Sequence, residues 1–281
     1  MPDLVAETTQ IFDTLTKTQK QVAEYFLTNK ESIAFDTLDE IAAKIDVSTT
    51  TVIRFARSLG FKGYSDMQTE VQNVIREKAA LPQRLNDAMR VNHDKLLLES
   101  FQNDVNNINI TLSMLSENEV KRAADVIAKA RTVYVLGMRS SFALAHYTMS
   151  RIGQVRTNMR LIQAAGQLYP EEIIGAGQPD VCVAFLFSRQ SKTTADILSW
   201  LKKWGVTVVL FTNTSTETVK ALGDVILQCN VKGVSYKNSF AAPICLINYL
   251  ASAVAMNNYP EAMKTLAQTE DILRQGYYLE M

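Results

Sequence analysis

The chain has 281 residues, of which 47% are hydrophobic and 21% charged, and its 29 basic and 29 acidic side chains give a formal net charge of +0. These proportions exclude wholesale disorder and a fibrous repeat, and the length suits two domains of ordinary size. Because the net charge is zero, any affinity for nucleic acid or for an anionic membrane has to arise locally.

Helix-start signals are dense in the first 80 residues, where strand signals are absent. Capping boxes, in which a hydroxyl side chain accepts a backbone amide and a Glu or Gln side chain reaches back, are predicted at Thr16, Thr37 and Ser65. Ser48 predicts one more helix start. Residues 1–78 are therefore predicted to form an all-α domain.

Residues 38–57 have the spacing of a helix-turn-helix. Ala42 is small where the two helices would cross, and Asp46 tolerates the left-handed backbone that the turn needs. In this motif the start of the second helix enters the major groove, where short hydroxyl side chains and cations contact phosphates and base edges. The candidate DNA-binding residues are Ser48, Thr49, Thr50, Thr51, Arg54, Arg57 and Lys62.

The charge distribution of this region favours the same partner, operator DNA. Residues 1–78 contain more acidic than basic side chains, against the usual expectation for a DNA-binding domain. Between Lys44 and Lys62, however, four of the five charged side chains are basic. The positive charge is thus expected to concentrate on the recognition surface. The alternative is a small helical unit that binds only protein.

A linker and the start of a connecting helix are predicted over residues 79–106, because Leu81-Pro82 indicates a break after Ala79 and Ala80. An apolar stripe with steps of three and four residues follows and predicts a long amphipathic helix. This stripe either packs against the second domain or contributes to a subunit interface. It consists of Leu98, Phe101, Val105, Ile108, Leu112 and Leu115.

From residue 132 onward, continuous apolar runs alternate with helical segments, as in parallel sheets that are covered on both faces. Residues 107–281 are therefore predicted to form an α/β sandwich. An uncharged stretch, residues 238–259, is interrupted by Pro243 and predicts a helix in the domain core rather than a membrane span. The predicted strands are 132–136, 160–163, 181–187, 206–211 and 225–227, and the predicted helices include 141–152, 193–204 and 244–256.

Cysteine usage and the N-terminal sequence indicate a cytoplasmic protein. Cys182, Cys229 and Cys245 lie in apolar runs without metal-ligand spacing, so we expect buried, reduced thiols and no metal site. No signal peptide is expected, because the first residues lack a basic and an apolar region. The phosphate-binding motifs of nucleotide cofactors are missing, so no cofactor is expected either.

Two hydroxyl-rich loops, residues 136–141 and 187–194, each join a predicted strand to a predicted helix. In open α/β sheets ligands bind beyond the carboxyl ends of the strands, and helix N-termini offer free amides to anions. The loops therefore predict a phosphate-binding site, while simple helix caps would explain only one serine in each. The candidate effector-binding residues are Ser140, Ser141, Ser188, Arg189, Gln190, Ser191, Thr193 and Thr194.

These parts, in this order, resemble RpiR-type transcriptional regulators, which join a helix-turn-helix domain to a sugar isomerase (SIS) domain. The resemblance covers nearly the whole chain and is most specific at residues 47–55, 59–64 and 187–194. It implies a five-stranded parallel sheet, control of carbohydrate-use genes by a phosphosugar, and a homo-oligomer, either a dimer or a dimer of dimers. It also implies that Ser141 and residues 188–194 hold the sugar phosphate.

Two positions depart from the common SIS pattern. Arg139 stands at the second glycine of the first loop, and Lys192 replaces a glycine of the second loop. Both changes remove backbone freedom and add positive charge. They are compatible with an effector that carries a second acidic group.

A sugar-phosphate isomerase with an accessory helical domain is the alternative function, since SIS domains also occur in enzymes. Isomerisation needs a general base and a ring-opening acid. The two histidines offer no such pair, because His93 falls in the predicted linker and His146 is expected to pack against the neighbours of its helix. Glu171 and Glu172 lack a partner in the sequence pattern. No catalytic residue is therefore expected.

Overall fold

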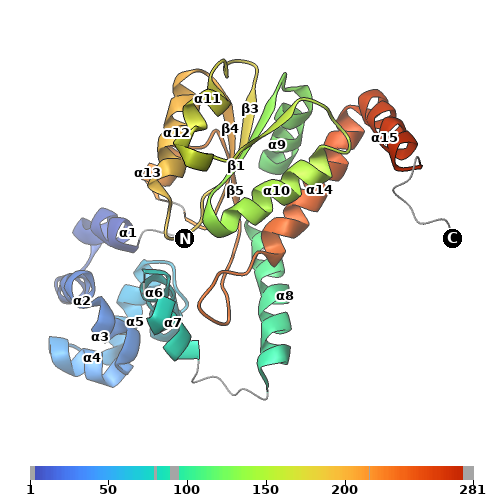
Figure 1. Cartoon of the computed structure of the whole chain (residues 1–281). Coiled ribbons are helices and arrows are strands. Elements are labelled where there is room, and N and C mark those ends of the chain that lie inside the picture. The colour runs from blue at the N-terminus through green and yellow to red at the C-terminus, as the bar shows by residue number, and fades with distance from the viewer. Residues whose placement is uncertain (1–3, 79–80, 89–94, 215, 275–281) are drawn as a thin grey trace. The chain divides into compact units, whose positions relative to one another are not determined.

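The computed structural model describes residues 4–78, 81–88, 95–214 and 216–274. The chain divides into two compact units, Met1–Asn86 and Asp87–Met281 (Figure 1). Each unit has its own apolar core.

The N-terminal unit is helical, as predicted. Phe26 and Phe55 meet edge to face at its centre, with ring centroids 5.8 Å apart. Val22, Ile33 and Ile41 are fully buried around them. Its elements are α1 (Leu4–Ile11), η1 (Phe12–Thr14), α2 (Lys17–Thr28), α3 (Lys30–Phe35), α4 (Leu38–Ile45), α5 (Thr49–Ser58), α6 (Tyr64–Lys78) and α7 (Leu81–Ala88).

Two of the three predicted capping boxes, at the starts of α2 and α4, are confirmed. The third is wrong, because Ser65 lies inside α6. Gln68 does not reach back to a helix start. Its Nε2 donates to the backbone oxygens of Ile33 and Asp36, at 3.1 and 2.7 Å. The Gln68 side chain, which the local pattern predicted to cap a helix, therefore forms a tertiary contact between α3 and α6 instead.

Helix α7 occupies part of the predicted linker. The break expected at residues 79–80 lies outside the described residues. Pro82 does not end a helix, because it is the second residue of α7. Proline is tolerated in the first turn, where a backbone amide has no partner within the helix.

The second unit is built on a five-stranded parallel sheet of order β2-β1-β3-β4-β5, which confirms the predicted fold class (Figure 1). Each predicted strand overlaps one of those observed. The register between the two central strands aligns Gly137 with Phe185. The strands are β1 (Val133–Gly137), β2 (Met159–Ile162), β3 (Val181–Phe185), β4 (Thr207–Thr212) and β5 (Val225–Gln228).

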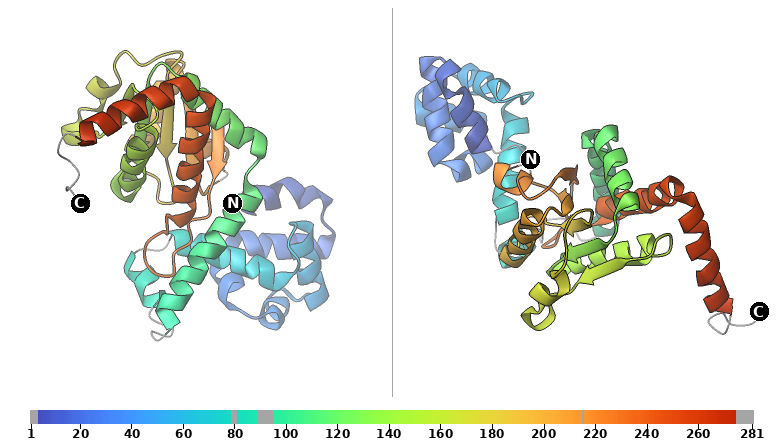
Figure 2. Two further views of the ribbon diagram at one scale, coloured as in Figure 1. Left: turned by 90° about the vertical axis from the view of Figure 1, so that its right-hand side faces the viewer. Right: turned by 90° about the horizontal axis from the view of Figure 1, so that it is seen from above.

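Helices cover both faces of the sheet (Figure 2). Val183 and Phe185 pack with the helices of one face, while Cys182 and Ala184 pack with those of the other, because successive side chains of a strand alternate. The first face carries α9 (Glu117–Lys129), α10 (Phe142–Ile152) and α14 (Ala241–Asn257), and the second carries α11 (Tyr169–Ile173), α12 (Lys192–Lys203) and α13 (Glu217–Lys220). The remaining elements are α8 (Leu96–Met114), η3 (Arg139–Ser141), η4 (Ala165–Gln167) and α15 (Tyr259–Arg274).

The uncharged stretch forms α14, whose Leu246, Ile247 and Leu250 are buried in the core as predicted. Within the described residues, no helix combines the length and the apolar character needed to cross a membrane. Cys182 and Cys229 are buried, and burial raises the pKa of Cys229 to about 12. The expectation of a buried Cys245 is wrong, because this residue of α14 is exposed.

The apolar stripe of α8 does not pack against the second domain over most of its length. Leu98, Phe101, Val105 and Leu112 are exposed, whereas Leu115, just beyond the helix, packs against the core. The first of the two alternatives for this stripe is therefore wrong for these four side chains.

Candidate functional site

Helices α4 and α5 form the helix-turn-helix. Ala42 and Ala56 are buried between the apolar faces of the two helices. Asp46 ends α4 in the left-handed conformation, with φ at 58°, as the sequence predicted. Ser48 begins α5, where its Oγ accepts the amide of Thr51 at 3.3 Å.

The start and outer face of α5 form an accessible polar surface. Ser48 and Thr51 bond to one another through their hydroxyl groups at 2.9 Å, and Thr49 and Thr51 are half-buried. The side chains of Thr50 and Arg54 are exposed and have no hydrogen-bond or ion-pair partner within the described residues. These two side chains are free to contact another molecule.

Two more of the predicted cations lie beside this face. Arg57 and Lys62 are both exposed. The Nε of Arg57 donates to the backbone oxygen of Lys62 at 3.3 Å, which joins the end of α5 to the turn that follows it.

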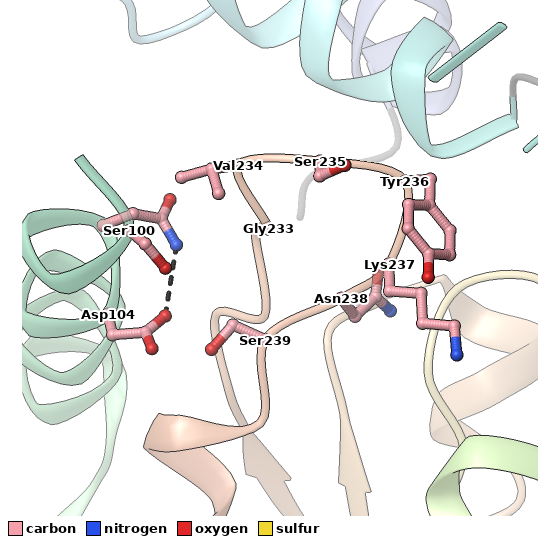
Figure 3. A pocket seen from close by; sticks show the side chains of 10 residues that line it. Ser100, Asp104, Gly233, Val234, Ser235, Tyr236, Lys237, Asn238 and Ser239 are labelled. Atoms are coloured by element: carbon pink, nitrogen blue, oxygen red, sulfur yellow. Dashed lines mark hydrogen bonds between the residues drawn. The ribbon is translucent and has the colours of Figure 1, made fainter. Parts of the chain in front are cut away.

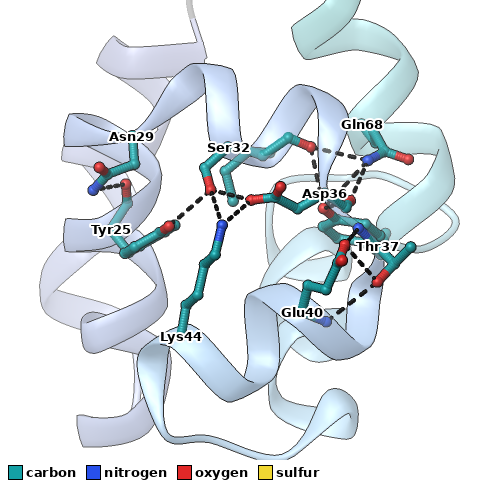
Figure 4. Close-up of polar contacts among 10 residues, drawn as sticks. Tyr25, Asn29, Ser32, Asp36, Thr37, Glu40, Lys44 and Gln68 are labelled. Atoms are coloured by element: carbon teal, nitrogen blue, oxygen red, sulfur yellow. Dashed lines mark hydrogen bonds and ion pairs between the residues drawn. The ribbon is translucent and has the colours of Figure 1, made fainter.

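Lys44, counted among the cations of this region in the sequence, is held by other side chains (Figure 4). Its Nζ donates to Asp36 Oδ2 at 2.6 Å and to Ser32 Oγ at 3.1 Å, and the hydroxyl of Tyr25 donates to Ser32 Oγ at 2.8 Å. The hydrogen bond from Lys44 holds the pKa of Asp36 below its usual value, and the same bond raises the pKa of Lys44. The network joins α2, α3 and α4, so the available positive charge comes from α5 and the turn after it.

The two hydroxyl-rich loops lie at the point where the strand order reverses. The chain passes from β1 to β2 on one side, and β3 flanks β1 on the other side. Because β1 and β3 are parallel neighbours, the loops that follow them lie side by side at the carboxyl edge of the sheet. Open parallel sheets bind ligands in the crevice at such a reversal.

The first loop turns back tightly onto the end of β1. A Cβ at Gly137 would collide with the carbonyl group of Ser141, so the turn requires glycine there. Ser141 is buried where α10 begins, and its hydroxyl makes no cap bond with that helix. Ser140 and Arg139 are exposed, and Arg139 adopts a left-handed φ of 55°.

The second loop ends in a capped helix. Ser191 Oγ accepts the amide of Thr194 at 3.3 Å at the start of α12, and Thr194 is buried. Gln190 and Thr193 are exposed. Lys192 turns along the helix to Asp196, with Nζ and Oδ2 2.7 Å apart, and this hydrogen bond raises the pKa of Lys192. Lys192, which stands where the common SIS pattern has a glycine, is therefore engaged in an ion pair with Asp196.

The beginning of the second loop is fixed from two neighbouring segments. The amide of Ser188 donates to Asn213 Oδ1 at 2.7 Å, and Ser188 Oγ accepts from Asn238 Nδ2 at 3.4 Å. Arg189 follows, exposed and with a left-handed φ of 65°.

Asn213 and Asn238 are not among the residues predicted from the sequence. Asn213 directly follows β4, so the rule used for β1 and β3 would have found it. Asn238 carried no such signal, because it lies ten residues beyond the end of β5.

A polar cavity of ≈ 300 Å³ lies between α8 and residues 233–239 (Figure 3). Ser100, Asn103 and Asp104 line it from the helix. Asn238, which bonds Ser188, lines it from the loop. The loop therefore contacts both α8 and the second hydroxyl-rich loop.

The groups that an isomerase would use are placed for other roles or lie outside the described residues. Glu172 accepts the amides of Gln163 and Ala164 at 3.0 and 2.9 Å, which fixes the end of β2. His146 is exposed beside the ring of Phe142, so the expectation that it packs into its surroundings is wrong. His93 is not among the described residues. Across the described part of the chain, no three His, Cys, Asp or Glu side chains form a metal-binding group.

Comparison with known families identifies both units. The sequence model of the "Helix-turn-helix domain, rpiR family" matches residues 4–78, and that of the "SIS domain" matches residues 126–253. An uncharacterised HTH-type transcriptional regulator of Caldanaerobacter subterraneus is 20% identical over 279 residues, which cover 97% of this chain and 98% of the relative.

Solved structures share the fold. The Vibrio vulnificus NanR protein complexed with ManNAc-6P has a TM-score of 0.59 at 19% identity, over 96% of this chain and 98% of its own. The sugar isomerase domain of an RpiR transcription factor from Sphaerobacter thermophilus has a TM-score of 0.60 at 21% identity, over 63% of this chain and 99% of its own.

Proposed function

The chain belongs to the RpiR family of helix-turn-helix transcriptional regulators with a SIS domain, and from this premise we propose that a phosphosugar controls its binding to operator DNA. The regulated genes serve carbohydrate use. Residues 1–78 bind DNA, residues 79–106 link and begin the connecting helix, and residues 107–281 sense the effector. The protein acts in the cytoplasm.

The start of α5 is the DNA-reading element of this proposal. Thr50 and Arg54 are its most accessible groups, since both are exposed and unpaired within the described residues. Hydroxyl and guanidinium groups suit base edges and phosphates. The proposed contacts are those predicted from the sequence: Ser48, Thr49, Thr50, Thr51, Arg54, Arg57 and Lys62.

The loops after β1 and β3 are the effector site of this proposal. The observation that carries it is their adjacency at the strand-order reversal, where helix starts converge with hydroxyl groups. The NanR protein, whose fold this chain shares, was solved as a complex with the phosphosugar ManNAc-6P, and this supports the ligand class. The proposed contacts are Ser140, Ser141, Ser188, Arg189, Gln190, Ser191, Thr193 and Thr194.

We propose a sensor rather than an enzyme. Glu172 is engaged in backbone hydrogen bonds, and α14 contains no Asp, Glu, His or Lys that could act as acid or base. A relative that matches nearly the whole chain is named as a transcriptional regulator, and this favours the same choice. Conversion of any phosphosugar that binds the protein would overturn this part of the proposal.

We also propose that the operator is palindromic and that a homo-oligomer, a dimer or a dimer of dimers, binds it. A single recognition helix contacts only a few base pairs, so specificity requires two half-sites.

A thermal-shift panel of phosphosugars tests the sensor, followed by operator titration with each compound that stabilises the protein. A true effector at 100 times its dissociation constant stabilises the protein by about 2.7 kcal/mol. Absence of a shift with every phosphosugar, or a shift without any change in operator affinity, would overturn the proposal.

A further inference from the structure

We propose that the phosphosugar effector carries a second anionic group and that Arg139 and Arg189 hold it. Arg139 lies in the first hydroxyl-rich loop and Arg189 in the second. The inference rests on the proposed effector site and names the class of ligand that this site selects, a phosphorylated sugar with a carboxylate or a second phosphate. Arg139 thereby joins the proposed effector contacts.

Both arginine side chains are available to a ligand. Each is exposed, and neither has a hydrogen-bond, ion-pair or aromatic partner within the described residues. Lys192, the other cation of the two loops, differs from them because its Nζ pairs with Asp196 Oδ2 at 2.7 Å. The two departures from the common SIS pattern are therefore not equivalent. The protein itself balances the charge of Lys192, whereas the charge of Arg139 is left for a ligand.

The loops that follow the five strands contain no acidic side chain. They are residues 138–141, 163–168, 186–191, 213–216 and 229–240. Glu172 of α11 reaches the end of β2, but its carboxylate already accepts the amides of Gln163 and Ala164. No carboxylate in these loops competes with a ligand for the two arginines, so an anion at this edge of the sheet meets unbalanced positive charge.

The pairing of β1 with β3 brings the two arginines to one place. Arg139 comes shortly after Gly137, and Arg189 comes shortly after Phe185, and these two strand ends are partners in the register. Neighbouring strands lie about 4.8 Å apart, which is less than the length of an arginine side chain. Both guanidinium groups can therefore reach one anionic group of a ligand.

The backbone presents both arginines from fixed positions. Arg139 lies between the tight turn at Gly137 and the buried Ser141. Arg189 follows Ser188, whose amide donates to the side chain of the residue after β4 at 2.7 Å. A ligand does not have to order these segments when it binds, and this favours affinity.

Both arginines also have a left-handed backbone, with φ at 55° for Arg139 and 65° for Arg189. Residues other than glycine are uncommon in this region, and glycine adopts it without steric cost. The local conformation thus disfavours a long side chain at both positions. Strained backbone of this kind clusters where a side chain serves binding.

The first phosphate has other donors, which lie deeper in the site. Ser141 and Thr194 are buried, and Ser191 is half-buried at the start of α12. The exposed arginines lie farther out, where a second group of the same ligand would be placed. The planar fork of a guanidinium group binds a carboxylate or a phosphate through two parallel hydrogen bonds.

Calorimetric titration of the full-length protein with two matched pairs of ligands tests the proposal. Sorbitol 6-phosphate and 6-phosphogluconate differ only at the end of the chain remote from the phosphate, where the second compound has a carboxylate. Fructose 6-phosphate and fructose 1,6-bisphosphate differ by one phosphate. In at least one pair the doubly anionic compound should bind at least about 10-fold more tightly, the smallest effect expected of one hydrogen bond to a charged group. The pair that shows the preference identifies the second group as a carboxylate or a phosphate.

Asparagine variants show whether the arginines cause this preference, because asparagine tolerates the left-handed backbone. In Arg139→Asn and in Arg189→Asn the preference should fall by about 10-fold or more. Lys192→Gln is the matched control, since it removes a cation that is already paired, and the preference should stay within about threefold of the wild type. Thermal unfolding establishes that each variant is folded.

Equal affinity within both pairs would overturn the proposal, as would a preference that both arginine variants retain. An equal loss of affinity for both members of a pair would assign the arginines to the first phosphate and would also overturn it. So would failure of both doubly anionic compounds to bind while another phosphosugar of the thermal-shift panel binds. These results leave phosphosugar sensing intact, whereas absence of binding by every phosphosugar overturns the proposed function as well.

Discussion

Two helix starts in different units of this protein share one local design. Ser48 begins α5 and Ser191 begins α12, and each serine Oγ accepts the amide three residues later at 3.3 Å. Two threonines occupy the second and third positions after each serine. The capping geometry therefore does not distinguish a nucleic-acid surface from a small-molecule pocket.

The difference lies in what surrounds each start. Thr51 is half-buried on a convex helix face that carries exposed arginines, whereas Thr194 is buried at the edge of a parallel sheet. The start of α12 also lies beside a second loop, because β1 and β3 are paired. An extended polyanion can contact the start of α5, whereas the start of α12 suits a compact phosphate group.

The largest expected effect is on phosphosugar affinity, and it distinguishes the start of α12 from the start of α5. Ser191→Asp keeps a good helix cap but places a carboxylate at the proposed phosphate position. Loss of one hydrogen bond to a charged group costs about 1.5–3 kcal/mol, or roughly 10- to 150-fold in affinity. Charge repulsion adds to this loss, so phosphosugar affinity measured by calorimetry should fall beyond that range.

Ser48→Asp is the matched control for this variant. It keeps the cap of α5 and should leave phosphosugar affinity unchanged, while it weakens operator binding. Coupling between two binding sites is reciprocal. If Ser191→Asp abolishes the effect of the phosphosugar on operator binding, it must also abolish the effect of operator DNA on phosphosugar binding. Wild-type phosphosugar affinity in Ser191→Asp would show that α12 is only a capped helix.

A second effect concerns base preference at the start of α5. Thr50 is exposed and unpaired within the described residues, so Thr50→Ala removes a hydroxyl that is available for a base edge. Discrimination at one base pair should change by about 1–3 kcal/mol, with other positions unaffected. Competition titrations with single-base operator variants measure this change. An unchanged preference at every position would exclude base contact by Thr50.

A smaller, sequence-independent effect is expected for Arg54→Ala. Arg54 is exposed one turn into α5, where its guanidinium suits a DNA phosphate. Removing one phosphate contact should weaken all sequences alike and lower the salt slope of log affinity by about 1. Fluorescence anisotropy at several salt concentrations measures the slope. An unchanged slope combined with altered base preference would instead assign Arg54 to a base edge.

The sequence predicted both helix starts because caps and strand ends are local patterns. Ser48 and Ser191 were found from hydroxyl side chains next to apolar runs, and Asp46 from the backbone that the turn requires. The parallel direction of the strands followed from their continuous apolar runs, whereas their order in the sheet was not predicted. The roles of the named contact residues in binding remain predictions.

Side-chain partners that come from distant segments could not be predicted. Gln68 fits a capping box locally, yet it bonds the end of α3. Asn238 reaches Ser188 from a segment 50 residues away in sequence. The apolar stripe of α8 predicted the helix but not its rotation, because three polar side chains on the opposite face decide which side faces the domain.

The smallest effect is expected for Lys44→Met. From the sequence alone Lys44 belongs with the cations of the recognition surface, but its Nζ is held by Asp36 and Ser32. Operator affinity should therefore change less than for Arg54→Ala, and the salt slope should stay at its wild-type value. The network is exposed to solvent, so we also expect a small change in thermal stability.

The pH dependence of that stability change identifies its origin. The pKa of Asp36 is lowered in the folded state, so its contribution is present above the unfolded value of about 3.9 and is lost as pH falls through the folded value. The pKa of Lys44 is raised, so its contribution is present below about 10.4 and is lost as pH rises through the folded value. The difference between wild type and Lys44→Met should thus be constant from about pH 5 to 9 and vanish in acid. A salt slope that falls by about 1 in Lys44→Met would mean that Lys44 contacts DNA after all, and the contrast with Arg54 would be lost.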